Sequence, residues 1–185
     1  MSRPGRRTQD TSQQDTERFH RLYTQTSQDL LAFLLRRCQT AEDAADCLSE
    51  TYRIAWQKRR QIPVEDTRAW LFGAARNVAR RQHTTATRQA AATRELALAA
   101  KHTDAIAPLS ATTRTALDAL SPLDREIITM LAWDDLAPRE VAIILGISPN
   151  VLRVRAHRAR AQLRATLTPP AADTPVQTTI TSKHL

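Results

Sequence analysis

Apolar residues recur at helical spacing along three segments in the first half of the chain. The segments begin near Thr16, Thr40 and Thr67. A spacing of three and four residues places apolar side chains on one face of a helix. The expected core-facing residues are Phe19, Leu22, Tyr23, Leu30, Leu31 and Leu34, then Ala41, Ala45, Leu48, Tyr52 and Ala55, then Trp70, Leu71, Ala74 and Val78. Three helices with short connections predict a compact helical domain over residues 16–83.

A second helical pattern covers residues 112–167 and contains a tight turn. Residues 138–145 form a short amphipathic segment that stops at Gly146, and Ser148 followed by Pro149 is typical of a helix start. The apolar stripe of the following helix is formed by Leu152, Ala156, Ala159 and Leu163. Two short helices joined by a glycine turn, the second one basic, predict a helix-turn-helix.

The second of these two helices carries five arginines and no acid between residues 149 and 164. Helical geometry directs Asn150, Val154, His157 and Arg158 away from the apolar stripe. It places Arg153, Arg160 and Arg164 along one edge and Arg155 near the other. Such a helix suits the major groove of DNA, where arginines at the edges hold phosphates and the outermost residues meet base edges.

Composition supports an all-α protein with an anionic partner. Aromatic residues make up 4% of the chain and there are 3 glycines, so a β-rich fold is disfavoured. The formal net charge of +8 indicates a polyanion as partner, although a membrane surface would also satisfy that charge. No apolar run has the length of a membrane span and no signal-peptide core is present, so we expect a cytoplasmic protein that is not inserted in a membrane.

Residue types suited to catalysis or metal binding are scattered. The five histidines and two cysteines form no cluster with metal-ligand spacing, and no glycine-rich phosphate loop is present. The sequence therefore predicts no catalytic residue, no metal and no cofactor, and a protein that is not an enzyme. Cys38 and Cys47 are expected to be thiols packed between helices, with a redox-sensing pair as the alternative.

Three segments fall outside the two helical patterns. Residues 1–15 are polar and basic, residues 84–111 are rich in Ala and Thr, and residues 168–185 begin with two prolines. We expect a disordered basic arm, a linker and a disordered tail. The expected fold is all-α, with two small helical domains joined by a flexible linker.

The second predicted helix has an acidic beginning and a basic end, which complements the helix dipole. Asp46 and Glu50 lie four residues apart, on one face of that helix. Taken alone, this pattern is typical of a solvated acidic face.

Several motifs together resemble a known family. The motifs are Ala45–Tyr52 followed by Ala55-Trp56, then Trp70-Leu71 followed by Ala75-Arg76-Asn77, then Ser121–Glu126, Glu140–Ser148 and Arg155–Arg160. In this order they resemble the extracytoplasmic-function subfamily of the sigma-70 family of bacterial sigma factors. Members of this subfamily retain two helical domains, region 2 and region 4. The family usually has glutamine at the position of Ser49, and small polar residues, glycine or threonine at those of Asn150 and Val151.

The resemblance implies an alternative sigma factor that binds core RNA polymerase and directs it to −10 and −35 promoter elements. Core polymerase would be contacted at its β′ clamp coiled coil and its β flap, and Asp46, Ser49 and Glu50 are the implied core-binding residues, with the acidic pair at the coiled coil. The single strand at −10 would contact Arg68, Arg76, Asn77 and Arg80, with a flipped base at the loop from Arg59 to Asp66. The duplex at −35 would contact Asn150, Val151, Arg153, Val154, Arg155, His157, Arg158 and Arg160. An anti-sigma factor is a further implied partner, and the free protein is expected to be a monomer.

Two alternatives remain open from the residues alone. A stand-alone helix-turn-helix regulator would account for residues 112–167 but would leave the acidic helix and the segment from Trp70 to Asn77 unexplained. An interaction protein that binds acidic partners without reading DNA would also use the basic helices.

Overall fold

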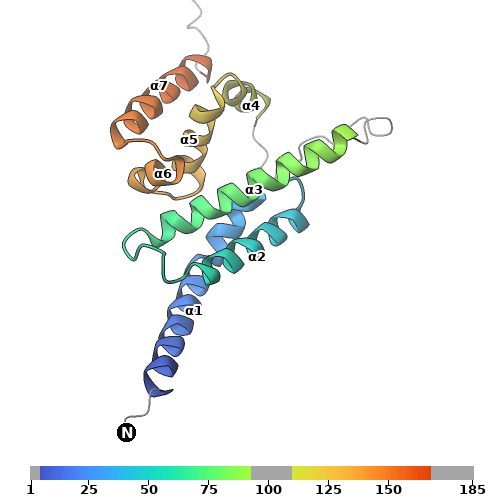
Figure 1. Ribbon diagram of the computed structural model, residues 1–185. Helices are drawn as coiled ribbons and strands as arrows, with labels where there is room; N and C mark the ends of the chain where they lie inside the picture. The colour runs from blue at the N-terminus through green and yellow to red at the C-terminus, as the bar shows by residue number, and fades with distance from the viewer. Residues whose placement is uncertain (1–4, 93–109, 168–185) are drawn as a thin grey trace, which may run out of the picture.

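The computed structural model describes residues 5–92 and 110–167, which form seven helices and no strand. The all-α prediction is confirmed. The helices are α1 (Gly5–Leu35), α2 (Ala41–Gln57), α3 (Thr67–Ala92), α4 (Ala111–Asp118), α5 (Pro122–Trp133), α6 (Pro138–Leu145) and α7 (Pro149–Leu167). Figure 1 shows α3 crossing the middle of the molecule, with α1 and α2 on one side and α4–α7 on the other. We call α1–α3 the N-terminal bundle and α4–α7 the C-terminal bundle.

The N-terminal bundle is organised around fully buried side chains of α1 and α3. Leu30, Phe33 and Leu34 of α1 are buried against Leu71 and Phe72 of α3. The rings of Phe33 and Phe72 meet edge to face with their centroids 5.1 Å apart, an arrangement that aromatic pairs favour. The α2 helix begins at a cap, because the Thr40 side chain accepts a hydrogen bond from the Asp43 backbone N–H at 3.0 Å.

The buried face of α2 differs from the predicted one. Tyr52 and Ala55 are buried as predicted, but Ala45 near the start of the helix is exposed and Ala44 and Cys47 are buried instead. Trp56, near the end of the helix, is 38% exposed and packs at the edge of the bundle against Phe19. The predicted face of α2 was partly wrong because α2 contacts both α1 and α3. Packing against two helices buries a different set of side chains from the set that apolar spacing within α2 indicates.

The N-terminal arm is helical from Gly5 onward, which differs from the expected disorder over residues 1–15. The arm continues α1, and Asp15 at its junction with the bundle pairs with Arg59 and Arg60, both at 3.1 Å. This ion-paired junction gives the helix a tertiary contact that local composition does not reveal. Residues 1–4 and 168–185 lie outside the described residues.

The C-terminal bundle contains the predicted helix-turn-helix as α6 and α7. Gly146 ends α6 with a φ of +65°, in the left-handed region that glycine adopts without strain. Ser148 then accepts a hydrogen bond from the Val151 backbone N–H at 3.3 Å, which caps α7. The apolar stripe of α7 is buried as expected at Leu152, Ala156 and Ala159, and Leu163 is partly buried.

One hydrophobic core runs through both bundles. Ile127, Met130, Val141 and Ile144 of the C-terminal bundle belong to the same buried cluster as the core of the N-terminal bundle. The α3 helix therefore has both faces covered, and its Phe72 is fully buried. The expected linker is partly helical, because α3 continues to Ala92, while residues 93–109 lie outside the described residues.

Candidate nucleic-acid and polymerase-binding surfaces

The α7 helix presents its predicted outer face to solvent. Asn150, Val154, His157 and Arg158 are exposed, as are Val151, Arg153 and Arg160. Val151 and Val154 are 46% and 44% exposed, which is high for β-branched apolar residues. The arginines Arg153, Arg158 and Arg160 have no side-chain partner within the described ranges. The exposed surface of α7 therefore combines these three arginines with the apolar side chains of Val151 and Val154 and the amide of Asn150.

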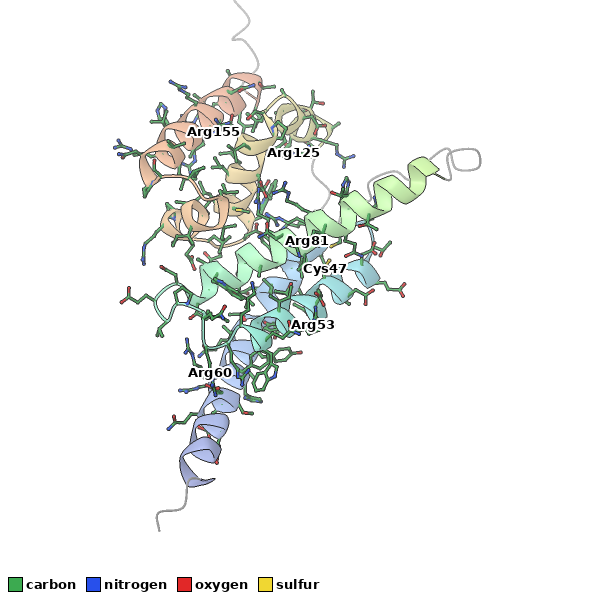
Figure 2. All side chains as sticks on the ribbon, in the orientation of Figure 1. Cys47, Arg53, Arg60, Arg81, Arg125 and Arg155 are labelled. Carbon is green, nitrogen blue, oxygen red and sulfur yellow. The ribbon has the colours of Figure 1, made fainter. Side chains whose placement is uncertain are left out.

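Arg155 differs from the other arginines of α7, because it is held inside the C-terminal bundle. Its Nε lies 2.9 Å from Asp124 Oδ1, and its Nη2 donates to Ser121 Oγ at 3.2 Å. Ser121 also caps α5 by accepting from the Asp124 backbone N–H at 3.2 Å. Figure 2 labels Arg155 on the C-terminal bundle, where it joins α7 to the start of α5. The sequence pattern did not reveal this structural role.

Two of the arginines expected at the −10 strand instead contact the C-terminal bundle. Arg76 of α3 donates to Glu126 of α5 through Nε and Nη2, at 2.6 and 2.7 Å. Arg68 donates to both Glu140 carboxylate oxygens, at 3.0 and 3.2 Å, and lies 3.5 Å from Asp29. The hydrogen bonds that Arg76 donates to Glu126 raise the pKa of Arg76. We call this contact between the bundles, where α3 and the end of α1 meet α5 and α6, the seam.

A buried carboxylate anchors the seam. Asp134, at the end of α5, has no exposed side-chain surface and pairs with Arg36 and with Arg37. Both arginines come from the residues that follow α1, and Arg37 Nη2 donates to Asp134 at 2.9 Å. Burial lowers the pKa of Arg37, and the charge of Asp134 opposes that effect. A carboxylate with two arginines satisfies the rule that buried charges are paired.

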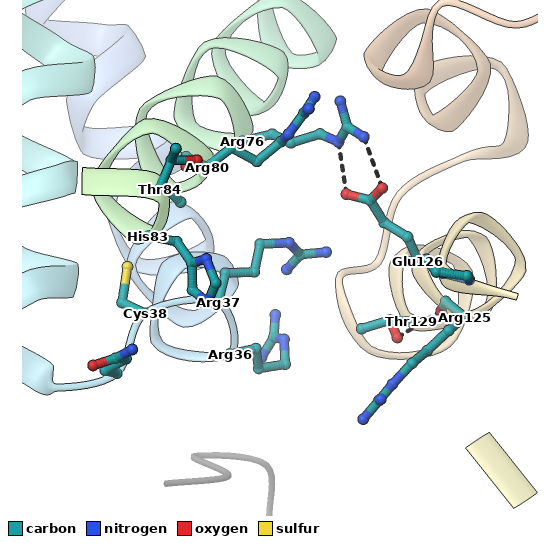
Figure 3. Close-up of a pocket in the computed structure, with 13 residues that line it drawn as sticks. Arg36, Arg37, Cys38, Arg76, Arg80, His83, Thr84, Arg125, Glu126 and Thr129 are labelled. Carbon is teal, nitrogen blue, oxygen red and sulfur yellow. Dashed lines mark hydrogen bonds and ion pairs between the residues drawn. The ribbon is translucent and has the colours of Figure 1, made fainter. Parts of the chain in front are cut away.

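A cavity of about 430 Å³ lies at the seam and is rich in arginine. Figure 3 shows Arg76 bonded to Glu126 across this space, with Arg37 directed toward it. Arg80 also lines the cavity, is exposed and has no side-chain partner within the described part of the chain. Asn77, one turn before it, is exposed on the same polar surface of α3.

A second cavity of about 430 Å³ lies between α1 and the loop that precedes α3. Its lining residues include Phe19, Leu22, Gln25 and Thr26 of α1, with Ile62 and Val64 of the loop and Arg68 of α3. Sequence reasoning placed a flipped base at the loop but did not identify the α1 residues. No sequence pattern links these α1 residues to the loop, because the cavity forms only when α1 packs beside the loop in the folded protein.

The acidic face of α2 is open to solvent. Asp46 and Ser49 are exposed, and Asp46 has no side-chain partner in the ranges described. Glu50 pairs with Arg53 at 2.6 Å, and this hydrogen bond lowers the pKa of Glu50. Figure 2 labels Arg53 on this part of α2.

The two cysteines lie close together, with 3.7 Å between their sulfur atoms. Burial raises the pKa of Cys38 to about 12 and also raises the pKa of Cys47. Cys47, labelled in Figure 2, lies beside α3 and contacts Gln82. Thiols held in the neutral form are poor nucleophiles, which favours the packing interpretation over the redox interpretation.

Within the described ranges, none of the helices has the length and apolar character of a membrane span.

A helix-turn-helix with a basic outer helix, packed on a second helical bundle, defines a DNA-binding protein of two helical units. Residues 22–89 match the family model for sigma-70 region 2, and residues 111–163 match the model for sigma-70 region 4. The chain belongs to the sigma-70 family, and its pairing of these two regions confirms the resemblance to the extracytoplasmic-function subfamily. It is an alternative sigma factor whose partners are core RNA polymerase and promoter DNA. Nothing in these matches supports a stand-alone regulator.

Solved structures share this fold. The sigma factor RpoE from Bartonella quintana, in complex with the anti-sigma factor NepR, is 23% identical, with a TM-score of 0.62 over 84% of this chain and 99% of RpoE. CnrH, in complex with the cytosolic domain of CnrY, is 24% identical, with a TM-score of 0.57 over 82% of this chain and 88% of CnrH. No curated protein matches the sequence.

Proposed function

We propose that this sigma factor holds a promoter at two points through the surfaces described above. The observation that carries the proposal is the pairing of a solvent-exposed basic recognition helix in region 4 with an arginine-bearing α3 helix in region 2. One helix suits duplex DNA and the other suits a single strand. The protein itself is proposed to position the polymerase without catalysing a reaction, and to act in the cytoplasm.

At the −35 element, the outer face of α7 would read bases and its edges would hold phosphates. Asn150, Val151, Val154, His157 and Arg158 are assigned to base edges. Val151 and Val154 suit the methyl group of thymine, and Asn150 and Arg158 suit adenine and guanine. Arg153 and Arg160 are assigned to phosphates, where free guanidinium groups are effective. Arg155 would contribute by its charge from within its pair with Asp124.

At the −10 element, α3 would follow the displaced strand. Arg68, Arg76 and Arg80 would contact phosphates, and Asn77 would bond to a base. The cavity between α1 and the loop before α3 is large enough for a base that has left the stack. Ile62 and Val64 supply apolar walls to this cavity, and Arg68 supplies a cation at its edge.

The polymerase contact is assigned to the acidic face of α2. Asp46, Ser49 and Glu50 would face arginines of the β′ clamp coiled coil, with region 4 at the β flap. Asp46 has no side-chain partner to displace among residues 5–92 and 110–167, so its carboxylate is available to such arginines. Opening duplex DNA costs several kcal/mol for each unstacked base, which a few arginines cannot supply without the polymerase.

An anti-sigma factor is a further proposed partner, because RpoE and CnrH were each solved with a bound partner, named for RpoE as an anti-sigma factor. Without one, the free protein is proposed to be a monomer.

Reconstituted transcription tests the proposed function. The purified chain is added to sigma-free bacterial core polymerase with promoter fragments from the host genome, and transcripts are mapped at their 5′ ends. We expect specific starts that require the chain, and co-elution of the chain with core. A chain that neither co-elutes with core nor yields a specific start would refute the proposal. Asp46→Ala should reduce co-elution, and Glu17→Ala, which alters an exposed acid of α1, should not.

A further inference from the structure

Four arginine side chains from two separate parts of the chain meet at the seam cavity. Arg36 and Arg37 follow the end of α1, and Arg76 and Arg80 lie four residues apart, on one face of α3. All four line the same space of about 430 Å³ (Figure 3). The side chains of Arg36, Arg37 and Arg76 are only 14–16% exposed, so most of this positive charge is shielded from water.

The carboxylates at the cavity balance only part of this charge. Asp134 pairs with both arginines that follow α1, and Glu126 pairs with Arg76. Arg80 has no side-chain partner in the part of the chain that is described. Four guanidinium groups and two carboxylates therefore leave an excess of two positive charges within this set of groups.

An anion would stabilise this arginine cluster. Burial lowers the pKa of Arg37, and the neighbouring charge of Arg36 acts in the same direction. The charges of Asp134 and Glu126 oppose that effect. Guanidinium groups bind phosphates through the same forked donors with which Arg76 holds Glu126. The lining of the cavity therefore favours a phosphate-bearing ligand with at least two negative charges.

The shape of the cavity favours a small molecule over a continuous strand. Figure 3 shows Glu126 and Thr129 of α5 across the space from Arg37. Because α5 forms this wall, the space can enclose a small ligand, whereas a strand follows an open groove. A volume of about 430 Å³ lies within the range of small-molecule sites in proteins. Arg125, also in the lining, pairs with Asp118 and adds no further excess charge.

We propose that the seam cavity binds a small molecule that carries a diphosphate group, either inorganic pyrophosphate or a nucleoside diphosphate. Two linked phosphates supply the negative charge that the cluster lacks. One phosphate would contact Arg76 and Arg80, and the other would contact Arg36 and Arg37. The site shares Arg76 and Arg80 with the surface assigned to the −10 strand, but its charge and shape do not depend on that assignment.

Calorimetric titration of the full chain with inorganic pyrophosphate, at low ionic strength, tests the site. Arg80→Gln removes a charge of the cluster without leaving a carboxylate unpaired, so we expect the fold to be retained. The matched control is Arg81→Gln, which removes the same charge from the next residue of α3, exposed but outside the lining of the cavity. Binding should be about tenfold weaker in Arg80→Gln than in the wild type and the control, because a charge-assisted hydrogen bond is lost.

Two further ligands define the chemistry of the site. Inorganic sulfate has a single anionic group and should bind about tenfold more weakly than pyrophosphate, because it cannot reach both pairs of arginines. ADP carries the same diphosphate group on a nucleoside. Tighter binding of ADP than of pyrophosphate would assign the site to nucleoside diphosphates, and equal or weaker binding would assign it to pyrophosphate itself.

Hydrogen–deuterium exchange locates the ligand on the wild-type chain. Saturating pyrophosphate should slow exchange at residues 36–39 and 122–129 as well as around Arg80, because the cavity is lined from all three segments. Protection confined to α3, equal affinity of Arg80→Gln and Arg81→Gln, or sulfate binding as tight as that of pyrophosphate would overturn the diphosphate site. These assays contain neither polymerase nor promoter, so a failure of promoter-specific transcription would count against the proposed function separately.

Discussion

The arginine side chains of this protein divide into those that build the structure and those that remain available. Arg36 and Arg37 pair with the fully buried carboxylate of Asp134, and Arg155 pairs with the half-buried carboxylate of Asp124. Arg153 and Arg158 have no side-chain partner among the residues described, and both are exposed. Sequence spacing predicted the exposure of the second group, because burial of the opposite stripe of α7 determines it. It did not predict the pairing of Arg155, since Asp124 comes from a different helix.

At −35, Arg153 and Arg158 should have different effects when removed. Arg153→Ala is expected to weaken binding to all −35 duplexes alike and to reduce the salt slope by about 1, because it removes a phosphate contact. Arg158→Ala is expected to cost about 1–3 kcal/mol on the preferred duplex and to relax preference at one base position. Holoenzyme binding to a set of single-base −35 variants, over a range of salt concentrations, distinguishes them. The assignment of faces is wrong if both substitutions weaken every duplex equally.

The thiols should react slowly in the folded protein. With the pKa of Cys38 raised to about 12, only about one molecule in ten thousand carries its thiolate at pH 8. Alkylation by iodoacetamide, followed by mass spectrometry, should therefore be orders of magnitude slower than in the urea-unfolded chain, which serves as control. Rapid modification of folded Cys38 at pH 8 would contradict the packing interpretation and restore the redox alternative.

Helix boundaries are decided at the scale of the element by capping residues and glycine. Ser121 and Ser148 accept backbone hydrogen bonds at the starts of α5 and α7, and prolines follow both, so the sequence predicted these starts correctly. The start of α1 was not predicted, because polar residues without an apolar stripe give no periodic signal. The position of its N-terminal part depends on the contact of Asp15 with the loop before α3.

Two glycines should respond in opposite directions to alanine. Gly146→Ala is expected to destabilise the protein by about 1 kcal/mol, because its φ of +65° strains a residue with a Cβ. Gly73→Ala is expected to stabilise it by about 0.5–1 kcal/mol, because Gly73 lies within α3 and the added methyl makes an ordinary contact at 3.9 Å. Thermal and urea unfolding measure both. A loss of stability in the Gly73 variant would show that α3 and α6 pack more tightly than this distance indicates.

At the scale of the whole molecule, the two bundles unite into one core rather than lying apart on a flexible linker. The α3 helix is covered on both faces, and Asp134 links the end of α5 to the end of α1. Arg68 and Arg76, which sequence reasoning left on an open surface, lie at this contact. Their availability to DNA therefore depends on the arrangement of the bundles.

Asp134→Asn should uncouple the bundles. Removing this carboxylate leaves Arg36 and Arg37 without their buried partner, which we expect to cost about 3–5 kcal/mol. Differential scanning calorimetry should show one transition in the wild type and two in the variant, as each bundle melts separately. Asp118→Asn, which breaks an exposed pair with Arg125, should change stability by less than about 1 kcal/mol and keep one transition. A single, unshifted transition in the Asp134 variant would contradict the role of Asp134 as the anchor of the seam.

The sequence by itself determined the helical character of both bundles, the helix-turn-helix, the outer face of α7 and the family. These depend on residue spacing, caps and glycine, which act over one or two helical turns, and on motifs that lie within single segments. Only the tertiary structure decided which face of α2 is buried, which α1 residues line the cavity beside the loop, and that α3 lies between the two bundles. Those features arise from contacts between residues distant in the sequence, such as Arg76 with Glu126 and Arg37 with Asp134. The sequence shows which residues are charged, but only the packing of the helices decides which carboxylate each buried arginine pairs with.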